Sequence, residues 1–297
     1  MIKIITDDGA DVPVRYVEQY NLDILPIAIN DGEHEFFNGV NITKDDVYNG
    51  MREGKVYKTA QVTLSKLIEV FTKYASEGVP VIYLPLSSGI SGTYSTAVIA
   101  MNDVLEKFPD AKIEVVDSLS ATFGEGMLAI KLAKLRDKGM EFESLVEKAK
   151  ELRYYQEHIY SVDTLEYLYR GGRVSKASKV VGGLLNIKPI LGLEKEKGTL
   201  NSIDKARGSK GLFSKILENM NRLSKDGEFN PKQTIAICHG DWEEEALRLK
   251  EYLVKNAGMA EEDVMISFIG PVIGAHTGPE ILGVCFSTNP DSEIDYF

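Results

Sequence analysis

Glycine and hydroxyl residues crowd one short segment, LPLSSGISGTYSTA at 84–97, which follows an apolar run and precedes a helical pattern. Gly89 and Gly92 allow a tight turn, and Ser91 and Thr93 offer hydroxyl groups. The first N–H groups of a helix lack intrahelical partners, and the helix dipole adds partial positive charge there. The segment therefore indicates a place for a small anion such as a carboxylate or a phosphate. The alternative is an ordinary strand-to-helix turn with hydroxyl caps.

Two enzyme motifs were compared with this segment. It lacks the G-x-G-x-x-G spacing of a dinucleotide site. The G-x-S-x-G elbow of serine hydrolases is matched at Gly89 and Ser91, but its last position is Thr93. A later histidine, His276, would be available as the base. An acyl esterase with Ser91 as nucleophile and His276 as base therefore stays open as the alternative function.

Two further segments carry polar groups that suit an anion. YKTAQVT at 57–63 puts Thr59 in an expected loop, where its hydroxyl is available. In TLEYLYRGGRVSKAS at 164–178, Arg170 and Arg173 flank two glycines, and guanidinium groups match planar oxyanions. The alternatives without a binding role are a helix start for the first segment and a solvated basic loop for the second.

The fourth polar segment is IGPVIGAHTGPEILG at 269–283, which we expect to be a tight connection between two strands. Its four glycines and two prolines surround His276 and Thr277. A lone histidine is usually structural, but one held in a Gly-Pro loop beside a threonine is a reasonable site candidate.

The first half of the chain alternates strand and helix patterns, which predicts parallel strands joined by right-handed crossovers. Asp11 is the expected N-cap of the first helix in this half, and Thr43 is the expected N-cap of the second. The expected strands are 2–6, 23–30, 79–86 and 112–117, and the expected helices are 11–19, 43–53, 64–76, 94–108 and 124–139.

The second half predicts an α+β arrangement with a mixed or antiparallel sheet. Its expected elements are a helix at 142–155, a strand at 158–162, a hairpin with a Lys-Gly turn at 188–204, strands at 234–240, 264–270 and 281–288, and a helix at 242–256. We therefore expect an α/β protein of two domains, a Rossmann-like domain at 1–140 with helices on both faces of its sheet and an α+β domain at 141–297.

Composition narrows the class of protein. The formal net charge of the 297 residues is −11, which argues against a nucleic-acid partner, since phosphate backbones need a basic face. No apolar run reaches the roughly 18 residues of a membrane span, and the amino terminus does not resemble a signal peptide. Cys238 and Cys285 lie in apolar runs, typical of buried thiols in a reducing compartment. The histidines lack metal-ligand spacing, so we expect a cytoplasmic protein without a bound metal.

Taken together, these segments resemble the DegV family of bacterial lipid-binding proteins across nearly the whole chain. The chain departs from the family pattern at Asp8, where serine is usual, at Ala60, and at Glu280, where glycine is usual. The matching stretches are Asp7 to Pro13, Thr59 to Val62, Ser87 to Tyr94, Val116 to Ser118, Leu165 to Arg173, Asn186 to Ile190 and Ile269 to Glu280.

This resemblance implies a long-chain fatty acid bound between the two domains, with no other cofactor and no catalytic machinery of its own. It also implies a role as the acyl-carrying subunit of a bacterial fatty acid kinase, whose separate ATP-binding subunit would phosphorylate the carboxylate. The residues implied to hold the carboxylate are Thr59, Ser91, Gly92, Thr93, His276 and Thr277. Those implied at the phosphoryl-transfer or partner surface are Arg170, Arg173 and Arg207.

Overall fold

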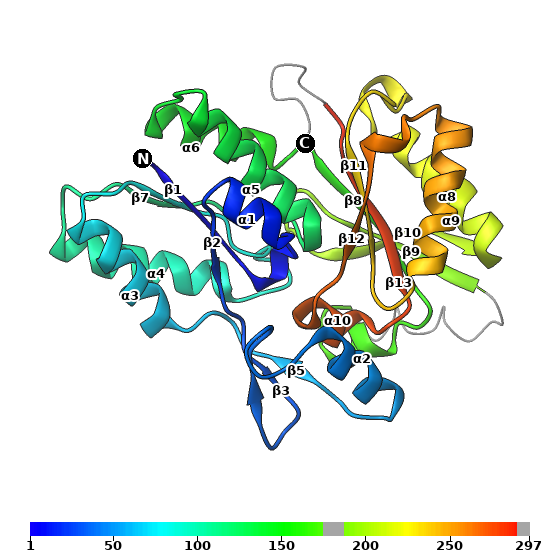
Figure 1. Cartoon of the computed structure of the whole chain (residues 1–297), viewed down its shortest axis with the longest axis horizontal. Helices are drawn as coiled ribbons and strands as arrows, with labels where there is room; N and C mark the ends of the chain where they lie inside the picture. The colour runs from blue at the N-terminus through cyan, green and yellow to red at the C-terminus, as the bar shows by residue number, and fades with distance from the viewer. Residues whose placement is uncertain (175–186, 290–297) are drawn as a thin grey trace.

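Two sheets and a small third one organise the chain, which a computed structural model describes at residues 1–174 and 187–289 (Figure 1). The first sheet is wholly parallel, with strand order β2-β1-β6-β7. Its strands are β1 (Lys3–Asp7), β2 (Asp23–Leu25), β6 (Val81–Tyr83) and β7 (Ile113–Val115). The chain reverses its direction of progress between β1 and β6, and open parallel sheets bind ligands outside the carboxyl ends of strands at such a point.

Helices cover both faces of the parallel sheet, as expected from the alternating pattern. On one side α3 and α4 pack together, and on the other α5 packs against β1 and α6 (Figure 1). The helices of this part are α1 (Val14–Gln19), α2 (Lys44–Arg52), α3 (Leu64–Ser76), α4 (Thr93–Lys107), α5 (Thr122–Asp137) and α6 (Phe142–Leu152). The Rossmann-like architecture is thereby confirmed.

The second sheet is mixed and has the order β10-β9-β8-β13-β11-β12, in which only β11 and β12 are parallel neighbours. Helices α8 and α9 cover one of its faces (Figure 1). The elements are β8 (Gln156–Val162), α7 (Glu166–Arg170), β9 (Ile187–Leu193), β10 (Leu200–Arg207), α8 (Gly208–Leu223), β11 (Ile235–His239), α9 (Glu243–Ala257), β12 (Val264–Phe268), α10 (Pro271–Thr277) and β13 (Ile281–Ser287). The α+β expectation, including the hairpin of β9 and β10, is confirmed.

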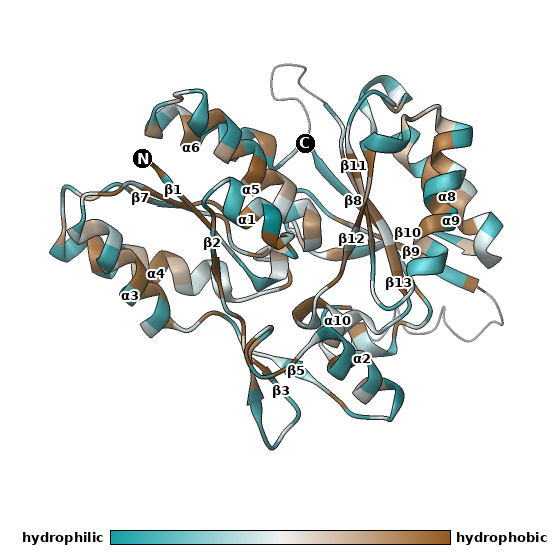
Figure 2. Cartoon of the chain, in the orientation of Figure 1, coloured by the Kyte–Doolittle hydropathy of each residue, from teal (hydrophilic) through white to brown (hydrophobic). Residues whose placement is uncertain are grey.

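Helix α5 lies between the two large sheets and contacts β1 on one side and β8, β11 and β13 on the other. Thirteen of its sixteen residues are buried, so it lacks a solvent face. Figure 2 shows the same apolar character in the strands on both sides, while α8 and α9 turn hydrophilic faces outward. Because α5 packs against both sheets, the domain boundary at residue 140 stays a prediction.

A three-stranded antiparallel sheet, β4-β3-β5, projects from the parallel part together with α2 (Figure 1). Its strands are β3 (Ile29–Asn30), β4 (Glu35–Phe36) and β5 (Lys58–Thr59). The sequence pattern predicts a single strand at 23–30, but the chain divides at Pro26, which cannot donate a backbone hydrogen bond. The two halves, β2 and β3, therefore join different sheets.

Capping was predicted correctly at one helix and wrongly at another. Thr43 caps α2 through a capping box with Asp46. Asp11 does not cap α1, which begins after Pro13; its backbone φ is +45°, and its Oδ1 accepts a hydrogen bond from Gly270 N at 2.8 Å. The carboxyl group is thus used across the molecule, at the start of α10, rather than locally.

Three helices were missed by the pattern analysis, of which the shortest is α7 in the third polar segment. The expected loop at 269–283 contains α10, which begins at Pro271, where the missing N–H costs nothing because helix starts leave it unpaired. Helix α8 begins with Gly208 and has a second glycine, Gly211, which weaken its local propensity. It forms because its buried face packs on the mixed sheet. In the described part of the chain, no helix is long and apolar enough to cross a membrane.

The close packing of α5 on the mixed sheet can be tested by a substitution at Gly124. A Cβ added there would lie 2.2 Å from Nε2 of His158, a fully buried ring, so Gly124→Ala should lower the free energy of unfolding by about 1–3 kcal/mol. Gly211→Ala is the matched control, because its added Cβ meets nothing within 4 Å. That variant should gain about 0.5–1 kcal/mol. Urea denaturation measures both, and equal effects would contradict the packing argument.

Candidate functional site

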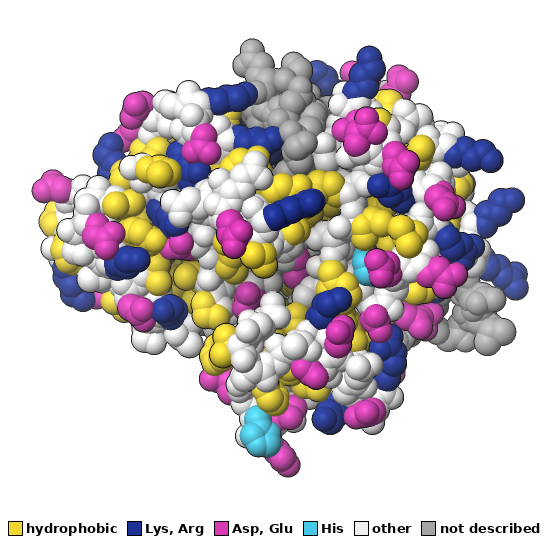
Figure 3. Space-filling model, in the orientation of Figure 1, with side chains coloured by type: hydrophobic (Ala, Val, Ile, Leu, Met, Phe, Trp, Pro, Cys, Tyr) yellow, Lys and Arg dark blue, Asp and Glu magenta, His cyan; other side chains and the backbone are white. Residues whose placement is uncertain are grey.

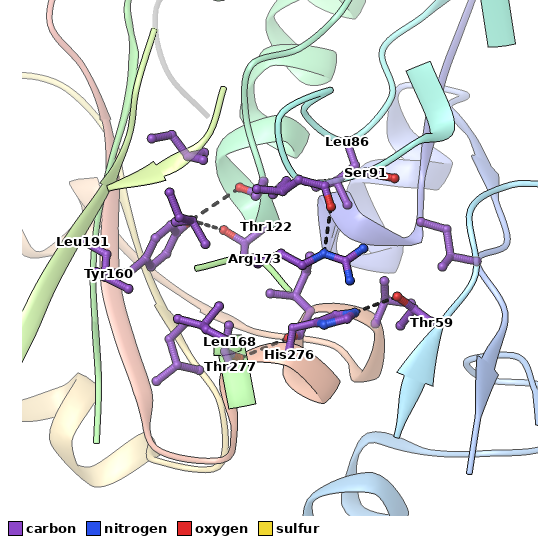
Figure 4. A pocket seen from close by; sticks show the side chains of 18 of the residues that line it. Thr59, Leu86, Ser91, Thr122, Tyr160, Leu168, Arg173, Leu191, His276 and Thr277 are labelled. Atoms are coloured by element: carbon purple, nitrogen blue, oxygen red, sulfur yellow. Dashed lines mark hydrogen bonds between the residues drawn. The ribbon is translucent and has the colours of Figure 1, made fainter. Parts of the chain in front are cut away.

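A cavity of about 250 Å³ lies where the carboxyl ends of the parallel strands face the mixed sheet (Figure 4). One water needs roughly 10–15 Å³ on this scale, so the cavity is far larger than a packing defect. Its lining comes from every part of the chain: Ile27, Thr59, Ala60, Gln61, Leu86, Ile90, Ser91, Gly92, Ala121, Thr122, Tyr160, Val162, Leu168, Arg173, Leu191, Leu193, Leu200, Val272, Ile273, His276, Thr277 and Ile281.

Most of the cavity wall is aliphatic. Eleven of the 22 lining residues are isoleucine, leucine or valine, and none is acidic. Leu191 and Leu193 alternate along β9 and so share one face of the strand, and Leu200 of β10 pairs with Leu193. Such a surface favours an extended apolar ligand over a polar one.

Thr59 and His276 meet at the polar end of the cavity, although 217 positions separate them in the sequence. Thr59 Oγ1 and His276 Nε2 are 2.7 Å apart (Figure 4). Thr59 stands on β5 of the small sheet, and His276 on α10. The bond therefore joins the small sheet to the second half of the chain at the edge of the cavity.

The His276 ring is neutral at physiological pH. Burial, and secondarily the positive charge of Arg173, lowers its pKa from 6.5 to about 4. Its Nδ1 is buried without a hydrogen-bond partner. An orphaned acceptor is less costly than an orphaned N–H, which favours the tautomer with the proton on Nε2. Nε2 then donates to Thr59, and the Thr59 hydroxyl is left to donate to a ligand.

The Ser91 hydroxyl is oriented in a similar way by Thr93. Thr93 Oγ1 accepts from Val62 N at 3.4 Å and lies 2.9 Å from Ser91 Oγ, which also accepts from Thr93 N at 3.2 Å. All partners are satisfied when Thr93 donates to Ser91, and Ser91 then has a free O–H. Thr93 is fully buried and supports Ser91 without lining the cavity, and its amide is already used.

Arg173 is the one cationic side chain among the described residues that line the cavity. Its Nε donates to Ile90 O at 3.0 Å and its Nη1 to Gly171 O, and the guanidinium lies between Ser91 and His276 (Figure 4). Burial lowers the pKa of Arg173, which remains charged. Among the described residues no carboxylate pairs with it. A half-buried guanidinium bound only to carbonyls is available to an anionic ligand.

A second polar group lies deeper, where α5 begins. Thr122 has a backbone φ of +51°, a strained value for a β-branched residue, and its hydroxyl bonds that of Tyr160. Tyr160 OH is also 3.1 Å from Cys285 Sγ, and Cys238 Sγ lies 3.8 Å from Cys285 Sγ. Both cysteines are buried free thiols. The hydroxyl groups of Thr122 and Tyr160 are hydrogen-bonded to each other, so they do not need a polar ligand as a partner.

The other predicted residues are distributed over three places. Gly92 lines the cavity, and a Cβ there would lie 2.1 Å from Gln61 Oε1, so a larger residue would displace the flexible Gln61 side chain. Thr277 lines it too, with its hydroxyl donating to Ile273 O at 3.1 Å. Arg170 lies outside it at the end of α7, and Arg207 ends β10, about 23 Å along the strand from Leu200. Neither arginine lines the cavity.

The three departures from the family pattern have local explanations. Asp8 Oδ2 accepts from Ile27 N at 3.1 Å and so shapes the turn before a cavity residue. Ala60 N donates to Ala28 O at 2.9 Å, a bond that needs no particular side chain. Glu280 is used through its backbone, whose oxygen accepts from Asp163 N at 3.2 Å. Positions 175–178 at the end of the third polar segment, and Asn186, lie outside the described residues.

The pattern analysis missed two sets of lining residues. The aliphatic wall on β9 and β10 had a signal, the alternation of Leu191 and Leu193, which places both on one strand face. Thr122 and Tyr160 had none, because only the packing of α5 on the mixed sheet brings them together. In the described ranges no cluster of three or more histidine, cysteine, aspartate or glutamate side chains is arranged to hold a metal ion.

Comparison with known proteins gives matches over nearly the whole chain. Residues 1–289 match a family model described as "Uncharacterised protein, DegV family". A DegV domain-containing protein of Clostridium perfringens is 34% identical over 286 residues, covering 95% of this chain and 96% of that protein.

Two solved structures extend the comparison. A fatty-acid-binding DegV family protein from Thermus thermophilus superposes with a TM-score of 0.84 at 28% identity, covering 96% of this chain and 99% of that one. A stearic-acid-binding protein from Eubacterium ventriosum gives a TM-score of 0.82 at 26% identity, covering 97% and 99%. These are proteins that the chain is similar to in fold along its full length.

The neutral state of His276 can be tested by pH. Between its folded pKa of about 4 and its unfolded value of 6.5, the unfolded chain binds the proton and the folded protein does not. His276 therefore adds stability that is complete above pH 6.5 and is lost as the pH falls toward 4. The difference in unfolding free energy between wild type and His276→Gln should shrink by up to about 2 kcal/mol from pH 7 to pH 5. Asp7 and Asp8, whose pKa burial raises to about 6, titrate in both proteins. A ring signal titrating near pH 6.5 in NMR would contradict the assignment.

Proposed function

This chain belongs to the DegV family, and from that premise we propose that it binds one long-chain fatty acid in the cavity between its two large sheets. The observation that carries the proposal is an aliphatic cavity whose polar end holds two free hydroxyl donors and a guanidinium that, among the described residues, bonds only to backbone carbonyls. The relatives from Thermus thermophilus and Eubacterium ventriosum, described as fatty-acid and stearic-acid binders, support the ligand class.

The apolar wall supplies most of the affinity. Each buried CH₂ group contributes about 0.8 kcal/mol, so a long acyl chain offers on the order of 10 kcal/mol before the cost of association. The wall is built from the loops that follow strands of the parallel sheet and from strands of the mixed sheet, so the ligand would bridge these two parts of the chain. A bound chain would therefore stabilise the protein against separation of the two parts.

The polar end suits a single carboxylate. A buried carboxylate is costly unless it is hydrogen-bonded, and Thr59 and Ser91 each have a hydroxyl that can donate to it. Arg173 adds the compensating charge. Neutral His276 orients Thr59, Thr93 orients Ser91, and Gly92 and Thr277 shape the same end.

We favour a carrier over an esterase because the supposed catalytic pair is not assembled. Ser91 Oγ is bonded to Thr93, and His276 Nε2 is bonded to Thr59 rather than to Ser91. A nucleophile of this kind needs its base within hydrogen-bond reach. The half-buried Ser91 would also be covered by the bound lipid.

The finer proposal is that the carrier presents its carboxylate to a separate ATP-binding kinase subunit in the cytoplasm. Its buried free thiols suit a reducing compartment. Arg170 and Arg207 are exposed and could meet such a partner, and both signs of charge are interspersed on the face shown in Figure 3. The chemistry of ATP would then belong to the partner.

Removing the hydroxyls should weaken lipid binding. Ser91→Ala and Thr59→Val each delete a donor to a buried anion, so each should reduce affinity for a long-chain fatty acid by about 1.5–3 kcal/mol. Isothermal titration of delipidated protein measures the loss, and mass spectrometry of gently denatured protein gives the lipid retained on purification.

Ser87→Ala is the matched control, since its hydroxyl lies in the same loop but donates to Gly198 O at 2.9 Å and does not line the cavity. It should cost stability without a comparable loss of affinity. Undiminished lipid and affinity in both Ser91→Ala and Thr59→Val would show that the carboxylate is held elsewhere.

Arg170→Ala should retain fatty acid and yet slow acyl-phosphate formation with a cognate kinase subunit, because fixed cations stabilise the charge on a transferred phosphoryl group. Glu166 forms an ion pair with Arg170, so Glu166→Gln is the control for a bracing role of that pair. The melting temperature, bound lipid and coupled rate are measured on one preparation. Equal slowing by both variants, or normal turnover by Arg170→Ala, would rule out a direct role.

A further inference from the structure

A second, smaller cavity of about 160 Å³ opens between α2, β5, α7 and α10. Figure 1 labels α2, β5 and α10 in the lower part of the view. We call this cavity the outer pocket. Its lining residues are Met51, Lys55, Val56, Tyr57, Lys58, Tyr167, Arg170, Gly171 and Ala275. None of them lines the acyl cavity, so the two spaces are separate in this structure.

The two cavities lie back to back. Lys58 of β5 lines the outer pocket while its neighbour Thr59 lines the acyl cavity, as expected where strand side chains alternate. On α10, Ala275 faces the outer pocket and His276 faces the acyl cavity. The partition between them is therefore the hydrogen-bonded pair of Thr59 and His276, the groups that would hold the carboxylate.

This partition is thin. A Cβ added to Gly171 would lie 2.2 Å from Nδ1 of His276, so the backbone of the outer pocket rests directly against the imidazole ring. That Nδ1 is buried and lacks a hydrogen-bond partner. One ring and one hydroxyl thus separate the expected carboxylate from the outer pocket.

The outer pocket is cationic in a protein whose net charge is −11. Lys55, Lys58 and Arg170 line it, and none of the described residues in its lining is an aspartate or a glutamate. Among the described residues no ion pair involves Lys55 or Lys58, whereas Arg170 is paired with Glu166. Tyr57 adds a phenol hydroxyl. Together these groups form an anion-binding set, of which the proposed function uses only Arg170.

We propose that the outer pocket is a phosphate subsite, which receives the phosphoryl group once the fatty acid carboxylate has become an acyl phosphate. This inference rests on the proposed function and adds Lys55 and Lys58 to it. One carboxylate charge is matched by Thr59, Ser91 and Arg173, but an acyl phosphate carries further negative charge beyond the carboxyl carbon. Charged donors meet phosphate oxygens better than neutral hydroxyls do.

For the phosphoryl group to reach the outer pocket, the hydrogen bond between Thr59 and His276 must break. The ligand can replace it, because its oxygens accept from both the Thr59 hydroxyl and the Nε2–H of His276. The carrier would then hold its product more tightly than its substrate, which suits delivery of a labile mixed anhydride to an acyl-accepting enzyme.

The test compares two ligands on delipidated protein, a long-chain fatty acid and a hydrolysis-resistant acyl phosphonate of the same chain length. The wild type should bind the phosphonate at least about tenfold more tightly, and salt should erode that preference. The double variant Lys55→Gln/Lys58→Gln should lose the preference while binding the fatty acid within about twofold of wild type. Both lysines are exposed, so folding should be unaffected.

Lys107→Gln/Lys112→Gln is the matched control, because these lysines line another surface cavity, at the opposite edge of the parallel sheet. It removes the same charge and should keep the preference. A wild type that binds both ligands equally, or a double variant that keeps the preference, would overturn the subsite while leaving lipid binding intact. Failure of the wild type to bind the fatty acid itself would instead overturn the proposed function.

Discussion

The hydrogen bond between Thr59 and His276 is the contact on which the site depends, because it closes the polar end of the cavity with groups from two distant parts of the chain. Its geometry relies on the position of α10. Tyr48 OH donates to Ile269 O at 2.9 Å, and Asp11 accepts from Gly270 N at 2.8 Å, immediately before that helix. The first part of the chain therefore sets where the histidine of the second part can lie.

Acidic groups lie where the two parts of the chain meet, and removing them from water costs free energy. Asp7, the last residue of β1, and Glu125, at the start of α5, are fully buried, and Asp11, four residues after β1, is half-buried; desolvation raises the pKa of each. Asp7 accepts from Leu86 N at 3.0 Å and Gly9 N at 2.9 Å, so it ties together the loops after β1 and β6. The loop after β6 carries the cavity residues Leu86, Ile90 and Ser91, and Asp7 is one means by which this loop is held in place.

The polar end of the cavity is neutral except for Arg173, and the cations of the outer pocket lie behind it. This distribution separates two tasks. Hydroxyl donors hold a carboxylate without neutralising its reactivity, and positive charge is kept where additional negative charge would arrive. The overall charge of −11 makes the local excess of cations more informative than it would be on a basic protein.

The sequence by itself determined the local elements whose signals are local. The parallel pairing of strands in the first half, the cap at Thr43, the hairpin of β9 and β10 and the polar segments around Ser91 and His276 all follow from periodicity, turn chemistry or motif. Only the tertiary structure decided that Asp11 bonds Gly270, that α8 forms despite two glycines, and that Thr122 meets Tyr160. It also decided that Arg173 enters the cavity while Arg170 lines a separate pocket. The reason is that these features depend on contacts between residues far apart in the chain, and such contacts override local preference without leaving a local pattern.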